Sequence, residues 1–131
     1  MDQHFERHEL DLLDVIEEVE IETVRSDTHS PHRSIIWIVV VASDAYVRSV
    51  NGHEAHWYQQ LVADAGGTLH ADGHMLPIRA VPVPDALIRT QVSEAYQHKY
   101  GHYPQDVAWL IGPDVQATTL RLVPKRPSGA S

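Results

Sequence analysis

Hydrophobic and polar residues in the first third of the chain recur with two different periods. Between residues 4 and 17 the apolar positions, Leu13 and Ile16 among them, recur every three to four residues, while acids fill the other positions. This pattern predicts an amphipathic helix. Residues 19–25 alternate at period two and predict a strand with one buried face. The polar segment at residues 26–33 contains a proline and predicts a loop.

The middle of the chain carries the strongest strand signal. Residues 35–41 form an uninterrupted apolar run rich in β-branched side chains, which favours a strand and is too short to cross a membrane. Residues 42–44 supply a polar turn, and residues 45–50 alternate as a second strand. Together they predict a β-hairpin at the centre of a sheet. The sequence Asn51-Gly52 turns the chain, and a short helix containing Trp57 follows.

Turn and capping residues divide the second half of the chain. Gly66-Gly67 ends the helix that begins near Trp57, and Asp72-Gly73 predicts a type I′ hairpin turn between two strands. Asp85 is placed to cap the next helix, which Gly101 ends. The predicted elements are strands at 68–71, 74–83 and 117–123 and a helix at 86–100. Residues 102–116 have an apolar centre between two prolines and fit neither pattern.

The order of these elements predicts an α+β protein. Helices and antiparallel strand pairs follow one another without the regular crossovers of a doubly wound sheet. The length of 131 residues is enough for one hydrophobic core. We therefore expect an acidic N-terminal helix at residues 1–18, a single folded body at residues 19–124 and a disordered tail at residues 125–131.

Charge and composition narrow the classes of partner. The formal net charge is −8, and residues 1–22 account for all of it, because they hold nine acids and one base while the remaining nine acids and nine bases cancel. This distribution argues against nucleic acid or an anionic membrane as a partner. The chain has no cysteine, which excludes disulfides and thiolate chemistry. No signal-peptide pattern is present, and no segment approaches the ~20 apolar residues of a membrane helix, so we expect a cytoplasmic protein.

Two strings of residues resemble a known family. The string VRSVNGHEAHWY at residues 47–58, which follows the apolar strand, and the string TTLRL at residues 118–122 resemble a small bacterial family of unknown function. That family looks like a branch of the pyridoxamine-phosphate-oxidase-like split barrels, which include flavin-dependent oxidases and deazaflavin-dependent nitroreductases. The resemblance covers roughly residues 17–124. It implies a six-stranded split antiparallel β-barrel with an N-terminal helix and two further helices.

The resemblance also implies a function and a set of binding residues. We expect an oxidoreductase that binds FMN or a deazaflavin at the interface of a homodimer, with Trp109 near that interface, and acts on a small organic substrate. The expected cofactor-binding residues are polar or aromatic side chains on or beside the central hairpin and the last strand: Ser34, Trp37, Arg48, Ser49, Trp57, Tyr58 and Thr118.

Arg48 is the strongest candidate from the residues themselves. A charge late in an apolar strand is costly unless a partner neutralises it, and a guanidinium can grip a phosphate with two parallel hydrogen bonds. A surface or interface arginine is the alternative. If Arg48 serves a ligand, its substitution should leave the fold intact.

Ten histidines raise the question of a metal site, but their spacing does not provide a recognised ligand set, and we predict none. His53 and His56 lie nearest to Arg48 in sequence and are the candidate acid–base residues. They support an alternative function, a flavin-free enzyme or small-molecule-binding protein on the same barrel, with histidine chemistry in an aromatic-lined pocket.

Overall fold

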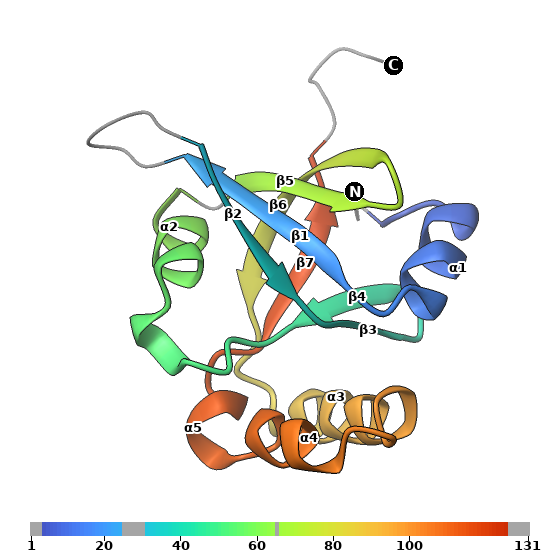
Figure 1. Ribbon diagram of the computed structural model, residues 1–131, viewed down its shortest axis with the longest axis vertical. Coiled ribbons are helices and arrows are strands. Elements are labelled where there is room, and N and C mark those ends of the chain that lie inside the picture. The colour runs from blue at the N-terminus through green and yellow to red at the C-terminus, as the bar shows by residue number, and fades with distance from the viewer. Residues whose placement is uncertain (1–3, 25–30, 65, 126–131) are drawn as a thin grey trace.

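The protein is an α+β fold built on one curled antiparallel sheet, as the computed structural model describes it for residues 4–24, 31–64 and 66–125 (Figure 1). Within these ranges there are seven strands, five α-helices and one 3₁₀ turn. In chain order they are α1 Arg7–Val15, β1 Val19–Val24, β2 Pro31–Ile36, β3 Ile38–Val41, β4 Asp44–Val47, the 3₁₀ turn Gly52–Glu54, α2 His56–Asp64, β5 Gly66–Ala71, β6 His74–Pro82, α3 Ala86–Lys99, α4 Pro104–Leu110, α5 Pro113–Gln116 and β7 Leu120–Pro124.

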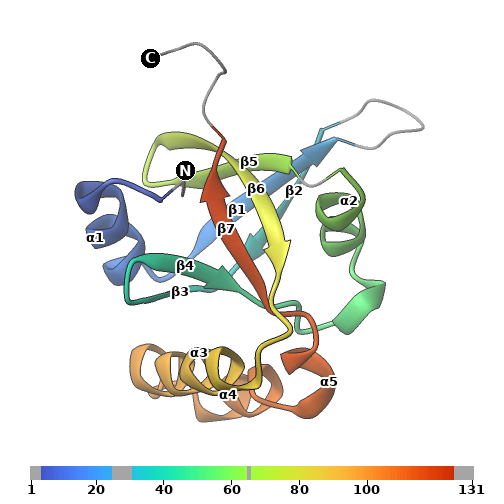
Figure 2. The ribbon, with the colours of Figure 1, turned by 180° about the vertical axis from the view of Figure 1, so that it is seen from behind.

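The sheet is curled, and its two edge strands follow one another in the chain. The strand order is β2-β1-β5-β6-β7-β4-β3, and every neighbouring pair is antiparallel. The edge strands β2 and β3 are separated in the chain by Trp37 alone. Figures 1 and 2 show β2 running directly into β3, while α1 and α2 flank the sheet and α3, α4 and α5 gather at one end.

The predicted split barrel is therefore right in class and wrong in strand number, seven instead of six. The apolar run at residues 35–41 is not one strand. Ile36 pairs with Val19 of β1, whereas Ile38 pairs with Val47 of β4. Residues on both sides of Trp37 are β-branched, so the alternation of the sequence gives no sign of the corner between them.

The segment predicted as a polar loop at residues 26–33 is also partly strand. Pro31, His32 and Arg33 begin β2 and pair with β1. Pro31 is tolerated because β2 is an edge strand and needs no ladder on its outer side. The rest of that predicted loop lies outside the described residues.

Several local predictions are confirmed. Asp72 and Gly73 have φ angles of 49° and 81°, as a type I′ turn requires, and this turn joins β5 to β6. The Asp85 side chain accepts a 3.0 Å hydrogen bond from the Ile88 N–H at the start of α3. The hairpin predicted between residues 35–41 and 45–50 is present in a shorter form, as β3 and β4.

Five α-helices are present in the described ranges, where three helices were expected. The two additional helices, α4 and α5, occupy the segment that fitted neither pattern, and each begins with a proline, Pro104 and Pro113. A proline suits the first turn of a helix, where its missing N–H has no partner to lose. Both helices are short, seven and four residues, which leaves too few residues for a helical period to be visible.

Two hydrophobic clusters hold the fold together. The larger one fills the curled sheet and includes Ile21, Leu69 and Leu120, with Leu13 of α1 packed into it. The second lies between the sheet and the helices α3 and α4, around Tyr96 and other residues of α3, α4 and β3. The predicted boundaries of the acidic helix and the body stay predictions, and the expected tail lies, apart from its first residue, outside the described residues. No described helix is both long and apolar enough to span a membrane.

Candidate functional site

A cavity of about 620 Å³ lies at the corner where β2 passes into β3, beneath α4. Its wall combines the connection between α1 and β1, the end of β2, the residues after β4, the start of α2 and part of α4. The lining residues are Glu18, Ser34, Ile35, Ile36, Trp37, Arg48, Val50, Asn51, Trp57, Asp106, Trp109 and Leu110. All three tryptophans of the chain are among them.

The structure brings four of the seven predicted cofactor-binding residues to this cavity: Ser34, Trp37, Arg48 and Trp57. The first two come from β2 and the corner that follows it. Arg48 comes directly after β4, and Trp57 is the second residue of α2. These four residues lie within 23 positions of one another in the sequence. The curl of the sheet brings their side chains to the same cavity.

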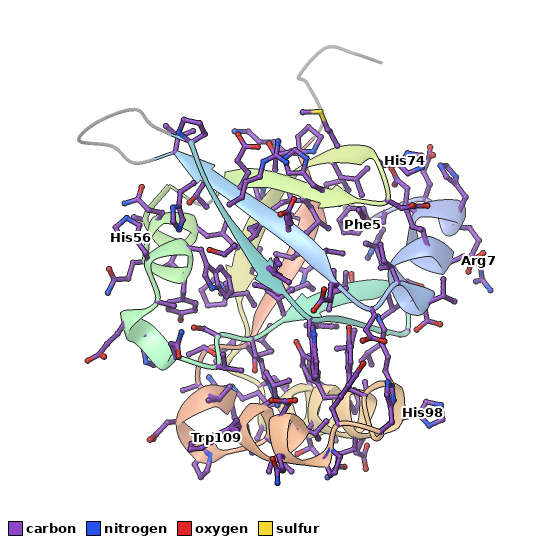
Figure 3. The ribbon with its side chains drawn as sticks, in the orientation of Figure 1. Phe5, Arg7, His56, His74, His98 and Trp109 are labelled. Atoms are coloured by element: carbon purple, nitrogen blue, oxygen red, sulfur yellow. The ribbon has the colours of Figure 1, made fainter. Side chains whose placement is uncertain are left out.

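Trp37 is held in place by the tyrosines of α3. Its ring stacks on that of Tyr100 with centroids 4.1 Å apart and planes 3° apart. The Tyr100 hydroxyl accepts from the Ile38 N–H at 3.2 Å and donates to the Glu17 carbonyl at 2.6 Å. Trp57 is buried, whereas Trp109 is 70% exposed and projects from α4 (Figure 3). The cavity thus has two fixed indole rings in its wall and a third at its mouth.

Arg48 forms part of the cavity wall but uses its donors inside the protein. Its Nε donates to Thr119 Oγ1 at 2.9 Å, and Nη1 donates to Ser93 Oγ at 2.8 Å and to the Leu110 carbonyl at 2.9 Å. Nη2 donates to the Arg89 carbonyl at 2.7 Å. These four bonds leave at most one of the five guanidinium N–H groups without an acceptor.

The environment of Arg48 is that of an interior residue. It is 2% exposed, and its guanidinium carbon lies 5.8 Å from the centre of the Tyr96 ring. Burial lowers the pKa of Arg48 to about 10, so the side chain stays charged at neutral pH. Its partners are hydroxyl and carbonyl oxygens of α3, α4 and the residue before β7. These contacts join four segments of the chain, so we expect replacement of Arg48 to destabilise the fold, contrary to the prediction from the sequence that folding would survive it.

Of the three remaining predicted cofactor-binding residues, Ser49 and Tyr58 directly follow lining residues in the chain. Ser49 and Thr118 are buried and bonded to each other, with the Ser49 N–H donating to Thr118 Oγ1 at 2.9 Å. Tyr58 is buried with its ring edge-on to His53, at a centroid distance of 5.4 Å. None of the three belongs to the cavity lining. Their roles toward a cofactor stay predictions.

The two predicted catalytic histidines also lie outside the cavity. His53 is in the 3₁₀ turn and His56 begins α2; both are exposed. Figure 3 shows His56 on the α2 side of the molecule, away from Trp109 on α4. The His56 ring meets that of His32 edge-on at 5.9 Å. The catalytic role of both histidines stays a prediction, without support from the position of the cavity.

Two carboxylates that sequence reasoning missed line the cavity. Glu18 lies between α1 and β1, and Asp106 lies in the first turn of α4. Neither forms an ion pair with another residue in the described part of the chain, and Arg48 is the one basic residue of the lining. The sequence did not single out Glu18, because it belongs to an acidic run that resembles a solvated helix face. Asp106 was missed because residues 102–116 matched neither a helix nor a strand pattern.

A possible cation-ligating group of another kind sits on α1. Oxygen or nitrogen atoms of Glu6, His8 and Glu9 lie within 4.8 Å of one another. Glu6 and Glu9 already form the capping box of α1, in which the Glu6 N–H donates to Glu9 Oε1 at 2.8 Å. Helix capping accounts for this arrangement, and none of the three residues lines the cavity.

Comparison with solved structures defines the class of fold. A candidate pyridoxamine 5'-phosphate oxidase from Listeria innocua superimposes with a TM-score of 0.65 at 15% identity, over 91% of this chain and 92% of its own. The heme storage protein HutZ from Vibrio cholerae gives 0.67 at 14% identity, over 95% and 92%. An F420-H2 dependent reductase gives 0.59 at 13% identity, over 83% and 96%. The fold is that of the pyridoxamine-phosphate-oxidase-like split barrels.

The family follows from the sequence itself. Residues 9–122 match the model of a family described as an uncharacterized protein conserved in bacteria, DUF2255, and the chain belongs to it. No protein with a curated description matches the chain. The resemblance predicted from residues 47–58 and 118–122 is confirmed. At these identities the solved structures fix the fold and leave the ligand open, since their own names range from a reductase to a heme storage protein.

Proposed function

We propose that the protein binds a flat heteroaromatic molecule of the flavin class, FMN or a deazaflavin, in the cavity and serves as an oxidoreductase on a small organic substrate. The observation that carries this proposal is the presence of all three tryptophans in the wall of one cavity. Indole rings offer large flat surfaces on which a planar ring can pack. The Ser34 hydroxyl adds a polar group at the same wall.

The tryptophans of the lining favour the flat ring of a flavin, whereas its charged residues do not favour the phosphate. A phosphate needs cationic or N–H donors with free capacity, and Arg48, the one basic lining residue, has four of its N–H groups engaged inside the protein. Glu18 and Asp106 would repel the phosphate. In this proposal the ring supplies the binding energy, the flavin would supply hydride transfer, and Arg48 supports the wall.

A flavin-free protein that binds a small apolar or aromatic molecule in the same cavity is the second candidate. The internal hydrogen bonds of Arg48 favour this second candidate. They occupy four of its five N–H groups, so the side chain cannot offer a phosphate two parallel hydrogen bonds. The acid–base role of His53 and His56 in this candidate has less support, since neither residue lines the cavity.

We further propose that a second copy of the chain covers the mouth of the cavity. Ile35 on β2, Val50 after β4 and Trp109 on α4 are exposed apolar side chains that all border the cavity. Large apolar side chains gathered at one site of a surface mark interaction sites. A two-fold dimer with Trp109 at its interface would bury them.

The proposed function is tested by titrating the purified protein with flavins while following tryptophan fluorescence. Binding in the cavity should change the emission, and Trp109→Ala should weaken the affinity by about 5- to 30-fold, as loss of one stacked ring implies. Leu87→Ala is the matched control, because Leu87 is an exposed apolar residue of α3 that does not line the cavity. If no flavin alters the emission while small aromatic molecules do, the flavin-free candidate replaces the first.

A further inference from the structure

The charges of the cavity lining are unbalanced toward the negative. Glu18 and Asp106 come from two separate elements, the α1–β1 connection and α4. Both side chains are exposed at the cavity, and neither has a basic partner among the described residues. Arg48, the one basic residue of the lining, keeps its positive charge, because its hydrogen-bond partners are neutral hydroxyl and carbonyl oxygens. The lining therefore carries two exposed carboxylates against one buried guanidinium, a formal net charge of −1.

The same wall carries the side chains best suited to an organic cation. The face of an aromatic ring attracts a positive charge, and tryptophan does so most strongly. Trp37, Trp57 and Trp109 all contribute to the lining. Aromatic rings supply contact with the apolar surface of an alkylated ammonium group, while carboxylates supply the long-range attraction.

We infer that the cavity binds an organic cation, an alkyl- or arylammonium group, as its substrate or ligand. The inference rests on the proposed function in one respect, that the cavity is the binding site, and adds the charge of the molecule bound there. The acidic segment of residues 4–22, which includes Glu18, contributes a field of the same sign and favours the approach of cations. The two carboxylates would disfavour an anionic substrate.

The test compares two molecules of one shape and different charge. Choline and its neutral carbon analogue 3,3-dimethylbutan-1-ol are added to nitrogen-15-labelled protein while the three indole N–H signals are followed by NMR. Choline should shift these signals and bind about 5- to 30-fold more tightly than the neutral analogue, as expected for a cation packed on aromatic rings. Equal affinity of the two molecules would overturn the inference.

Variants that remove one negative charge show which carboxylate contributes to choline binding. Glu18→Gln and Asp106→Asn should each weaken choline binding by about 2- to 5-fold at low salt, leave the neutral analogue unaffected, and lose this effect at high salt. Asp114→Asn is the matched control, because Asp114 is an exposed acid of α5 that does not line the cavity. Unchanged choline affinity in both cavity variants would also overturn the inference.

Riboflavin in the same titration separates this inference from the proposed function. If riboflavin shifts the indole signals and choline binds no better than its neutral analogue, the cavity is a binding site without a preference for cations. If neither choline, its analogue nor riboflavin shifts any indole signal, the cavity is not a binding site and both proposals fail.

Discussion

The Nε of Arg48 donates to the Thr119 hydroxyl over 2.9 Å, and this bond joins the residue after β4 to the residue before β7. Thr119 Oγ1 in turn donates to the Gln116 carbonyl at the end of α5. Arg48, which the sequence predicts to bind a ligand, joins the segments that form the wall of the cavity.

The first prediction concerns the stability that Arg48 provides. Arg48→Ala should lower the free energy of unfolding by about 3–5 kcal/mol, because buried oxygens of Arg89, Leu110 and Ser93 lose a charged donor. Arg48→Lys should cost less, since lysine keeps the charge but has three donors instead of five. Urea unfolding measures both. Arg7→Ala is the control, because Arg7 is a fully solvated arginine of α1 (Figure 3); a loss for Arg48→Ala no larger than for this control would contradict the internal role.

The second prediction concerns the docking of α1. Leu13 is fully buried in the sheet cluster, and the Leu13 carbonyl accepts a 2.8 Å hydrogen bond from Lys99 Nζ. Leu13→Ala combined with Ile16→Ala should lower stability by at least the roughly 2–5 kcal/mol of one buried leucine truncation. Thermal unfolding followed by circular dichroism measures this. An unchanged midpoint in the double variant would mean that the helix does not contribute to the core.

The third prediction is a pH dependence from Lys99. Burial lowers the pKa of Lys99 to about 8 from 10.5, while its Nζ donates to the Leu13 and Ile38 carbonyls. Between pH 8 and pH 10.5 the unfolded chain binds more protons than the folded one, so the free energy of unfolding should rise as the pH increases through this range. Below pH 8 the buried lysine is charged in the folded protein, and stability is lowest with respect to this group. Partial exposure to solvent reduces the gain to about 1 kcal/mol.

Urea unfolding at neutral pH and at a pH between the two pKa values measures this rise. Lys99→Met should abolish it, whereas Lys125→Met, which removes an exposed lysine, should not. The pH must also stay below the range in which tyrosines of the unfolded chain ionise. Burial raises the pKa of Tyr96 and Tyr100 in the folded protein, so their ionisation in the unfolded chain lowers stability at higher pH. An identical rise in wild type and Lys99→Met would contradict the assignment.

The fourth prediction concerns assembly. If a second copy covers the apolar mouth of the cavity, the wild-type protein should be a dimer at micromolar concentration and Trp109→Lys should be a monomer, since a charge at the interface core is costly. Light scattering measures the mass of both, with Leu87→Lys as the control for an exposed apolar residue elsewhere. A monomeric wild type would contradict the dimer.

Local turn chemistry was the part of the fold that the sequence could predict. Asp72-Gly73 adopts two positive φ angles, which few other residue pairs tolerate, and Asp85 caps α3; both depend on neighbouring residues only. The corner at Trp37 could not be predicted, because it depends on which distant strands, β1 and β4, pair with the two halves of one β-branched run.

For the candidate site, the sequence predicted some of the lining residues but not the contacts that they make. The tryptophans near the central hairpin were identified from their residue type, and Trp37 and Trp57 do line the cavity. The cost of a charge in an apolar stretch correctly singled out Arg48, but the sequence could not show what compensates it. Its partners Ser93, Leu110 and Thr119 lie 45 to 71 residues away in the chain, and only the tertiary structure brings them to the guanidinium.

The most direct test of the account is the affinity of the protein for riboflavin compared with FMN, which differ by one phosphate. If the tryptophan-lined cavity holds the ring and Arg48 is internally bonded, calorimetry should show that riboflavin binds at least as tightly as FMN, and Trp109→Ala should weaken both equally. Affinity for FMN that exceeds that for riboflavin by about tenfold or more, as a charged hydrogen bond to the phosphate would give, would contradict the account and return Arg48 to the role of phosphate ligand.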